Sequence, residues 1–307
     1  MSRRLLFVHA HPDDEASKGA ATAARYVDEG AEVTLVTCTG GEAGDVLNPA
    51  AEVGDEDMAS IRARELAAAV AAIGFTRTHR LGYRDSGWHE DPGDVPEGVF
   101  SRLPIDEPAR RLAGILRTER PHIVVTYPED GGYPHPDHIM THLVTERAMT
   151  LAADAHADLG DAAGAGAGAW QVAKVYASTI FPAERLEALH AAMLDEHGES
   201  PYTKWLEKRA ERRFGPDPDS RIACAGHFER RDAALLAHVT QVDPEGMWFA
   251  VPRELERRVY PYEGFLLLRS AVLTRLPEAD LFAGLDPEAW DAANLAPATC
   301  GSVGAER

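Results

Sequence analysis

The sequence predicts an α/β protein with a Rossmann-like, doubly wound and mostly parallel sheet. Two observations lead to this prediction: short apolar runs alternate with longer helical patterns, and the chain opens with a strand, a helix and a second strand in succession. Such a unit favours parallel strands joined by a right-handed crossover. The 307 residues are enough to bury a large core, and their hydrophobic fraction of 45% is that of an ordinary globular protein.

The individual elements follow from the hydrophobic period and from residues that end helices. Residues 4–8 and 31–39 read as buried strands, and residues 16–30 between them read as a helix that ends at Gly30. The alternation continues with strands at 79–83, 122–127 and 174–179, and with helices at 58–73, 107–119, from 136 onward, 183–197 and 226–239. The stretch 158–170, rich in glycine and alanine, is expected to be an exposed flexible loop.

This pattern divides the chain into three parts. Residues 1–180 are expected to form the Rossmann-like core. Residues 181–288 are expected to form a smaller C-terminal α/β portion that packs on the core and lines the substrate cleft. Residues 289–307 are predicted to be a flexible tail, because the ending LAPATCGSVGAER lacks apolar periodicity.

Composition limits the partners and the compartment. The formal net charge of -19 argues against a nucleic-acid or anionic membrane surface, so we expect a small-molecule partner. The three cysteines are scattered and odd in number, which fits a reducing cytoplasm better than a disulfide framework. No apolar run has the length of a signal-peptide core or a membrane span, so a cytoplasmic location is expected. The oligomeric state stays open.

Charged residues crowd at the ends of two predicted strands. HAHPDDE, residues 9–15, follows the first strand, and HPDH, residues 135–138, follows the strand at 122–127 after a glycine-containing turn. Open α/β sheets bind their ligands at the carboxyl ends of their strands. A purely structural explanation is that Pro12 and Pro136 are the first residues of two helices, with Asp13 and Asp137 in their first turns, where the helix dipole favours negative charge.

Taken together, the two segments favour a metal site. His11, Asp14 and His138 form a set of two histidines and one carboxylate, which suits Zn²⁺ in a catalytic site and also suits Fe²⁺. Asp13 is then the natural general base for water, while His135 and Tyr133 could face a substrate carbonyl. The glycines of DGGYP, residues 130–134, would let this second loop bend close to the metal.

The two segments resemble the signatures of the LmbE-like zinc deacetylases, which are related to N-acetylglucosaminyl-phosphatidylinositol de-N-acetylase. The resemblance extends to about residue 285 and is closest to the mycothiol branch found in actinobacteria, through TCTGGEAGDVLNPA, YRDSG, GGYPHPDH and LLAHVTQVDP. It implies that His11, Asp14 and His138 hold zinc and that Asp13 is the base. It also implies that His135, oriented by Asp137, stabilises the oxyanion, and that Tyr133 donates a hydrogen bond to the amide oxygen.

The same resemblance implies contacts to substrate. Lys18 would contact the acyl cysteine portion of a conjugate, and Glu42, Arg62 and Asp85 would contact sugar and inositol hydroxyls. Gln241, in the C-terminal part, could also reach the cleft. Each role has a structural alternative: Lys18 as a solvated helix residue, Arg62 paired with acids along its helix, Glu42 in a glycine turn and Asp85 as a turn cap.

The leading hypothesis is a zinc amidase that cleaves thiol conjugates of mycothiol to glucosaminyl-inositol and a cysteine conjugate, in the detoxification of electrophiles and antibiotics. The first alternative is the N-acetyl-glucosaminyl-inositol deacetylase of mycothiol biosynthesis, which shares the catalytic set. A second is a tailoring amidase in antibiotic biosynthesis. A nucleotide-binding module without hydrolytic activity is disfavoured, because the first strand-to-helix turn has no G-x-G-x-x-G.

Overall fold

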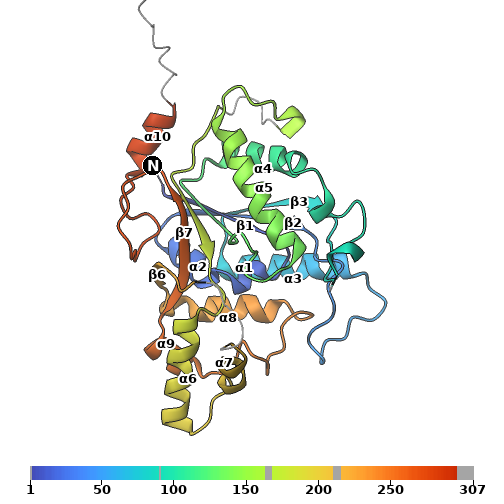
Figure 1. Ribbon diagram of the computed structural model, residues 1–307, viewed down its shortest axis with the longest axis vertical. Coiled ribbons are helices and arrows are strands. Elements are labelled where there is room, and N and C mark those ends of the chain that lie inside the picture. The colour runs from blue at the N-terminus through green and yellow to red at the C-terminus, as the bar shows by residue number, and fades with distance from the viewer. Residues whose placement is uncertain (1, 90, 163–167, 210–215, 296–307) are drawn as a thin grey trace, which may run out of the picture.

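A computed structural model describes residues 2–89, 91–162, 168–209 and 216–295 of the protein (Figure 1). Within these ranges one seven-stranded sheet has the order β3-β2-β1-β4-β5-β7-β6. The first five strands along the chain are parallel, whereas β7 runs antiparallel to both β5 and β6. The predicted fold class is therefore confirmed. The strands are β1 (Arg4–His9), β2 (Glu32–Thr39), β3 (Arg77–Tyr83), β4 (Ile123–Thr126), β5 (Lys174–Ser178), β6 (Ser220–Ala223) and β7 (Tyr262–Ser270).

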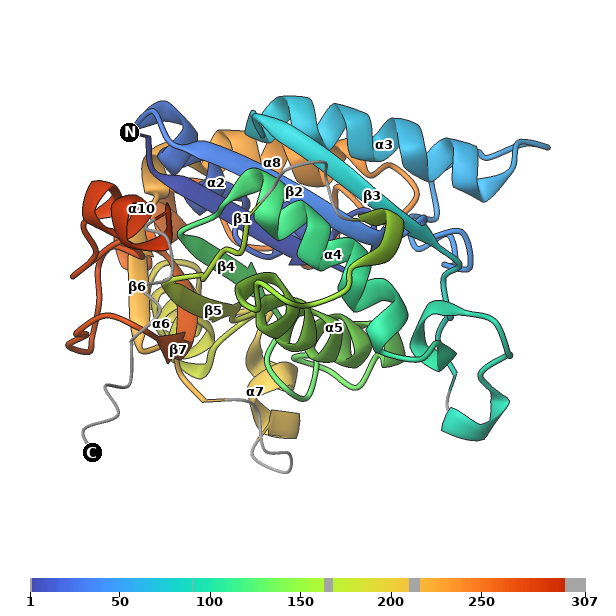
Figure 2. The ribbon, with the colours of Figure 1, turned by 90° about the horizontal axis from the view of Figure 1, so that it is seen from above.

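Helices cover both faces of the sheet (Figure 2). One face carries α1 (Asp14–Ser17), α2 (Ala20–Asp28), α3 (Met58–Ile73) and α8 (Phe228–Ala237), and the other carries α4 (Asp106–Glu119) and α5 (Pro136–Ala153). Short 3-10 helices occur at Pro92–Asp94, Phe100–Arg102, Gly160–Ala162 and Ala225–His227. Among the helices that the structure describes, none is both long and apolar enough to cross a membrane.

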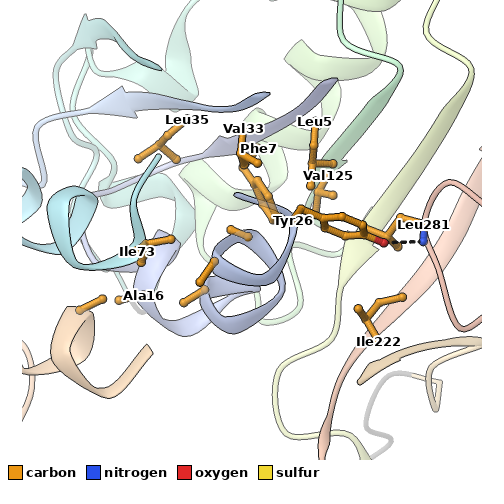
Figure 3. Packing of buried hydrophobic residues seen from close by; sticks show 14 of the residues in the cluster. Leu5, Phe7, Ala16, Tyr26, Val33, Leu35, Ile73, Val125, Ile222 and Leu281 are labelled. Carbon is orange, nitrogen blue, oxygen red and sulfur yellow. Dashed lines mark hydrogen bonds between the residues drawn. The ribbon is translucent and has the colours of Figure 1, made fainter. Parts of the chain in front are cut away.

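The alternation of side chains along β1 fills two cores. Leu5 and Phe7 point to the face of α2 and α3, where they pack with residues such as Tyr26 (Figure 3). Leu6 and Val8 point to the opposite face and pack with residues of α4 and α5. Tyr26 also accepts a hydrogen bond from the backbone N–H of Leu281 over 2.8 Å, which ties the segment between β7 and α10 to the first core (Figure 3).

A third core lies under the C-terminal helices. It is formed around α6 (Ala183–His197), α7 (Thr203–Arg209) and α9 (Arg253–Val259), which gather at the bottom of Figure 1. Its buried members are Leu186, Leu189, Met193, Tyr202, Val251, Leu255 and Tyr260. This group of helices follows the parallel strands along the chain, while β6 and β7 extend the sheet itself. The last helix of the described ranges is α10 (Pro287–Leu295).

The predicted helix over residues 16–30 is broken into two. The helix α1 stops at Ser17 and α2 starts at Ala20, because Gly19 between them has a φ of 104°. A Cβ at Gly19 would lie 2.9 Å from the ring of Phe7 in β1, so only glycine allows this close approach. The prediction of one continuous helix was wrong because the helical pattern of the sequence contains no sign of this contact.

Two segments predicted to be flexible are partly anchored. Trp170, at the end of the predicted loop, is buried and donates from Nε1 to the carbonyl of Pro121 over 2.7 Å. Residues 289–295, predicted to belong to the tail, are part of α10, where buried Asp291 pairs with Arg4 and His122. The tail expectation was wrong for residues 289–295, and the loop expectation was wrong for Trp170, because both rested on local composition and the anchoring partners are distant in sequence. Residues 163–167 and 296–307 lie outside the described ranges.

Candidate active site

The order of the strands places two loops beside each other. The chain runs outward from β1 through β2 to β3, and then returns to β4 on the other side of β1. The strand order therefore reverses between β1 and β4, which is where open α/β sheets form their binding crevice. The loop after β1 carries HAHPDDE, and the loop after β4 carries HPDH, so the two charged segments meet as expected.

The predicted metal ligands lie together. His11, Asp14 and His138 are buried, and one ligand atom of each lies within 4.8 Å of the others. The Nδ1 of His138 bonds to the carbonyl of Gly131 over 3.1 Å, so this nitrogen carries the proton and Nε2 keeps its lone pair. This buried Nε2 has no hydrogen-bond partner and lies 3.6 Å from Oδ1 of Asp14. A free imidazole lone pair that faces a carboxylate fits a divalent cation.

The other ligands are oriented by buried partners. Tyr127 donates its hydroxyl to Oδ2 of Asp14 over 2.6 Å. Burial alone would raise the pKa of the Asp14 carboxyl, but Lys18 and His138 lower it well below its usual range, so Asp14 is ionised. The Nε2 of His11 lies 3.2 Å from Asp137 and 3.5 Å from Asp85, while its Nδ1 lies 3.4 Å from Oδ2 of Asp14. This arrangement leaves the Nδ1 side of His11 for a metal.

Asp13 has an unusual backbone conformation and a charged partner. Its φ is 106°, in the left-handed region that aspartate rarely adopts. Nη2 of buried Arg62 lies 2.9 Å from Oδ2 of Asp13 and also bonds to the carbonyl of Pro12. Burial raises the pKa of the Asp13 carboxyl, and Arg62 opposes that rise. The result is a carboxylate held at the cavity wall beside the ligand set, where it can act as a base.

Glu15 is a site residue that the sequence analysis missed. Its Oε2 accepts a hydrogen bond from the backbone N–H of Asp13 over 3.0 Å, and its Oε1 pairs with Nε2 of His238. The side chains of Glu15 and His238 are completely buried. The pair therefore fixes the backbone of Asp13 from the C-terminal part of the chain. Glu15 directly follows HPDD in the sequence, but its role could not be predicted because its partner, His238, lies 223 residues away.

His135 and Tyr133 lie over the ligand set. The ring of His135 is centred 4.6 Å from that of His11 and 5.1 Å from that of His138, and the ring of Tyr133 is 4.6 Å from that of His138. Nδ1 of His135 accepts from the backbone N–H of Asp137 over 3.2 Å, so its Nε2 carries the proton. Burial and the nearby His11 lower the pKa of His135 to about 4, which keeps the ring neutral at neutral pH.

Asp137 orients His135 through its backbone N–H, because it lies in the first turn of α5, whose N-cap residue is His135. Its carboxylate has other partners: it accepts from His11 and from Ser86, whose backbone N–H is 2.9 Å away. The glycine expectation is supported: Gly131 has a φ of 76°, and a Cβ there would be 2.8 Å from Cβ of His138.

The residues expected to bind substrate separate into two groups. Lys18 and Gln241 line a cavity of about 420 Å³ together with Asp13, Asp14 and Tyr133. Lys18 is buried and ion-paired with Asp14, so its alternative as a solvated side chain is wrong. The second group consists of Glu42, Arg62 and Asp85, which are not among the residues that line this cavity.

The second group is already engaged in protein contacts. Glu42 accepts from the backbone N–H of Asp85 over 3.0 Å, and Asp85 accepts from those of Ala43 and Gly87 over 3.2 and 2.9 Å. Arg62 is held by Asp13. The contacts of Glu42 and Asp85 match their structural alternatives, although Glu42 is only partly buried and keeps some access to solvent. Arg62 has its expected helix partner, with Nε 3.7 Å from Oε2 of Glu65, but it also pairs with Asp13, which lies outside its helix.

Comparisons with known proteins identify relatives of the chain. Residues 6–149 match the PIG-L family, described as GlcNAc-PI de-N-acetylase. The chain is 47% identical over 289 residues to the mycothiol S-conjugate amidase of Streptomyces coelicolor, a match that covers 92% of this chain and 97% of that protein. It is 42% identical over 301 residues to a 1D-myo-inositol 2-acetamido-2-deoxy-alpha-D-glucopyranoside deacetylase of Geodermatophilus obscurus, covering 92% and 98% of the two chains.

Solved structures have the same fold at lower identity. N,N'-diacetylchitobiose deacetylase from Pyrococcus horikoshii aligns with a TM-score of 0.57 at 19% identity, over 87% of this chain and 84% of that one. At this level the likeness concerns the fold alone. The sequence relatives, named as amidases and deacetylases, support a hydrolase that acts on amide bonds. The chain belongs to the PIG-L, or LmbE-like, family of hydrolases.

Proposed function

We propose that the protein is a zinc-dependent amidase that cleaves mycothiol S-conjugates into glucosaminyl-inositol and a cysteine S-conjugate, in thiol-dependent detoxification. The observation that carries the proposal is the buried set of His11, Asp14 and His138 with Asp13 beside it. The 47% identity to a mycothiol S-conjugate amidase supports the substrate. The ligand set suits Zn²⁺ and also Fe²⁺.

Asp13 would handle the proton of the attacking water. A divalent cation held by His11, Asp14 and His138 would supply Lewis acidity to the amide carbonyl and to water. Asp13 would accept a proton from that water and pass it to the departing amine. Arg62 would hold the Asp13 carboxylate in place, and the pair of Glu15 and His238 would hold its backbone.

Two further residues would stabilise negative charge on the amide oxygen. His135 is neutral and has its proton on Nε2, so it is a hydrogen-bond donor in the pH range of most assays. Tyr133 is half-exposed at the cavity and has a raised pKa, caused by burial and by Asp14, so its hydroxyl stays protonated and can also donate. Preorganised donors of this kind each contribute roughly 3 kcal/mol to the stabilisation of a transition state.

The biosynthetic N-acetyl-glucosaminyl-inositol deacetylase is the second candidate. It is favoured by the 42% identity to a protein with that deacetylase name, and by several further relatives that carry the same name. Both reactions would use the residues described above. They differ in the acyl group, which is a substituted cysteine in one case and acetate in the other.

The test is a comparison of two substrates with zinc-loaded protein. We expect a higher kcat/KM for a bimane conjugate of mycothiol than for acetylated glucosaminyl-inositol. We also expect that a chelator abolishes both activities and that added Zn²⁺ restores them. A preference for the acetylated compound would instead assign the biosynthetic deacetylase. Activity that survives complete removal of metal would contradict the metal-dependent mechanism.

A further inference from the structure

The cavity beside Asp13 has a wall that the hydrolytic chemistry does not use. This wall consists of Leu47, Ile180, Phe181, Trp205, Met247 and Trp248. Leu47 is 64% exposed, and Trp205 and Met247 are each 39% exposed, although they are large apolar side chains. Exposed apolar side chains are ordinary when they are scattered, but a group that lines one cavity indicates a binding surface.

The backbone of Phe181 supports this interpretation. Phe181 follows β5 and has a φ of 49°, in the left-handed region that aromatic residues rarely adopt. In this conformation its ring packs against Trp205 and Trp248, with centroid distances of 5.6 and 4.9 Å. Strained residues of this kind cluster at binding sites, where the neighbouring structure holds them in place. The cost in backbone energy is consistent with a ring placed for a ligand.

The side chains of the wall favour an apolar group over a sugar as the occupant. The hydroxyl groups of glucosamine or inositol need hydrogen-bond partners when they leave water, and the six wall residues have apolar side chains except for the indole N–H groups. The charged groups of the lining, Asp13, Asp14 and Lys18, lie at the catalytic end. The lining therefore combines the charged residues beside the cleavage site with a large group of apolar side chains.

From this combination we propose that the apolar wall binds the substituent on the sulfur of the conjugate, and that the enzyme prefers aromatic and other large apolar substituents. The proposal rests on the proposed function, because only a cysteine conjugate carries such a group next to the amide. An acetyl group has two carbon atoms and would leave most of a 420 Å³ cavity unfilled. A flat aromatic substituent could stack on Phe181 and the two tryptophans.

The experiment compares two conjugates that differ only in the substituent on sulfur. Zinc-loaded wild-type protein and the Trp205→Ala variant are assayed with the bimane conjugate and with the methyl conjugate of mycothiol. We expect wild type to favour bimane, and Trp205→Ala to lower kcat/KM for bimane about tenfold while the methyl conjugate changes less than about twofold. Leu194→Ala is the control, because Leu194 is 44% exposed on α6 and is not among the residues lining the cavity.

Binding gives a second readout that does not depend on turnover. Titration with the N-acetylcysteine conjugate of bimane, followed by tryptophan fluorescence, should show weaker binding to Trp205→Ala than to the Leu194→Ala control. Because Trp205 also packs on Phe181, Met247→Ala is used as a second variant that removes an exposed wall residue with a smaller effect on folding.

The outcomes separate the inference from the function on which it rests. If the wild type cleaves acetylated glucosaminyl-inositol and neither conjugate, the proposed function fails and the wall assignment fails with it. If both conjugates are cleaved with equal kcat/KM, or if Trp205→Ala and Met247→Ala lower both values alike, the amidase stands and the wall assignment is overturned.

Discussion

The same three residues, His-Pro-Asp, occur at the ends of β1 and β4 and have different structures there. In the second segment His135 is the N-cap of α5, Pro136 is its first residue and Asp137 lies in the first turn, buried against His11. In the first segment the helix α1 begins only at Asp14, and Asp13 is its N-cap residue in the left-handed region. Pro12 therefore lies outside the helix, contrary to its predicted place as the first helical residue.

Because of this difference in backbone conformation, Asp13 and Asp137 have different roles although they occupy equivalent positions in the motif. Regular helical geometry turns Asp137 inward, where its carboxylate has no access to solvent and can only orient another residue. The irregular backbone of Asp13 places its carboxylate at the cavity, where it can meet a water molecule. A shared motif therefore specifies residue types, and the backbone of each loop determines which of them meets the substrate.

Among the variants that test this comparison, Asp13→Asn should have the largest effect on activity. We expect kcat/KM to fall by about 10²–10⁴-fold, because the amide cannot accept a proton from water. The zinc content should stay at the wild-type value, since Asp13 is not one of the three ligands, and metal analysis after dialysis measures this. Loss of zinc together with activity would show that Asp13 holds metal instead of acting as a base.

The equivalent substitution in the second segment, Asp137→Asn, should affect the metal first. It weakens the contact that orients His11, and we expect the affinity for Zn²⁺ to fall by roughly 10–100-fold. Competition with a chromogenic chelator measures this affinity. At saturating zinc, kcat should recover to a larger fraction of wild type than in Asp13→Asn, and a failure to recover would remove the distinction between the two aspartates.

The smallest expected effect is on stability and arises from backbone strain. It is measured by comparing glycine with alanine at positions 13 and 137. Asp13→Gly should be more stable than Asp13→Ala by about 1–2 kcal/mol, because only alanine has a Cβ that opposes the left-handed conformation. At position 137 the order should reverse, and alanine should be more stable by about 0.5–1 kcal/mol because the residue is helical. Urea unfolding of the four variants tests this, and the same order at both positions would contradict it.

The sequence was sufficient to predict the parallel strands, the two loops that meet and the three candidate ligands that lie together in them, but it did not predict β6 and β7. Hydrophobic periodicity located β1, β2, β4 and β5, and the residue types at the ends of β1 and β4 pointed to His11, Asp14 and His138. The sequence alone could not predict that the Asp137 carboxylate orients His11, or that Glu15 and His238 fix the backbone of Asp13. These contacts depend on the dihedral angles of a loop and on partners brought close only by the complete fold.

The third core under α6, α7 and α9 has a consequence for how this enzyme could change over time. Trp205 belongs to α7, which packs on this core, whereas His11 and Asp14 follow β1 and His138 lies in α5. Mutations in α6, α7 and α9 are therefore expected to perturb this packing unit more than the loops that carry His11, Asp14 and His138. Selection, or directed evolution in the laboratory, could vary the accepted acyl group in small steps while hydrolysis continues at each step.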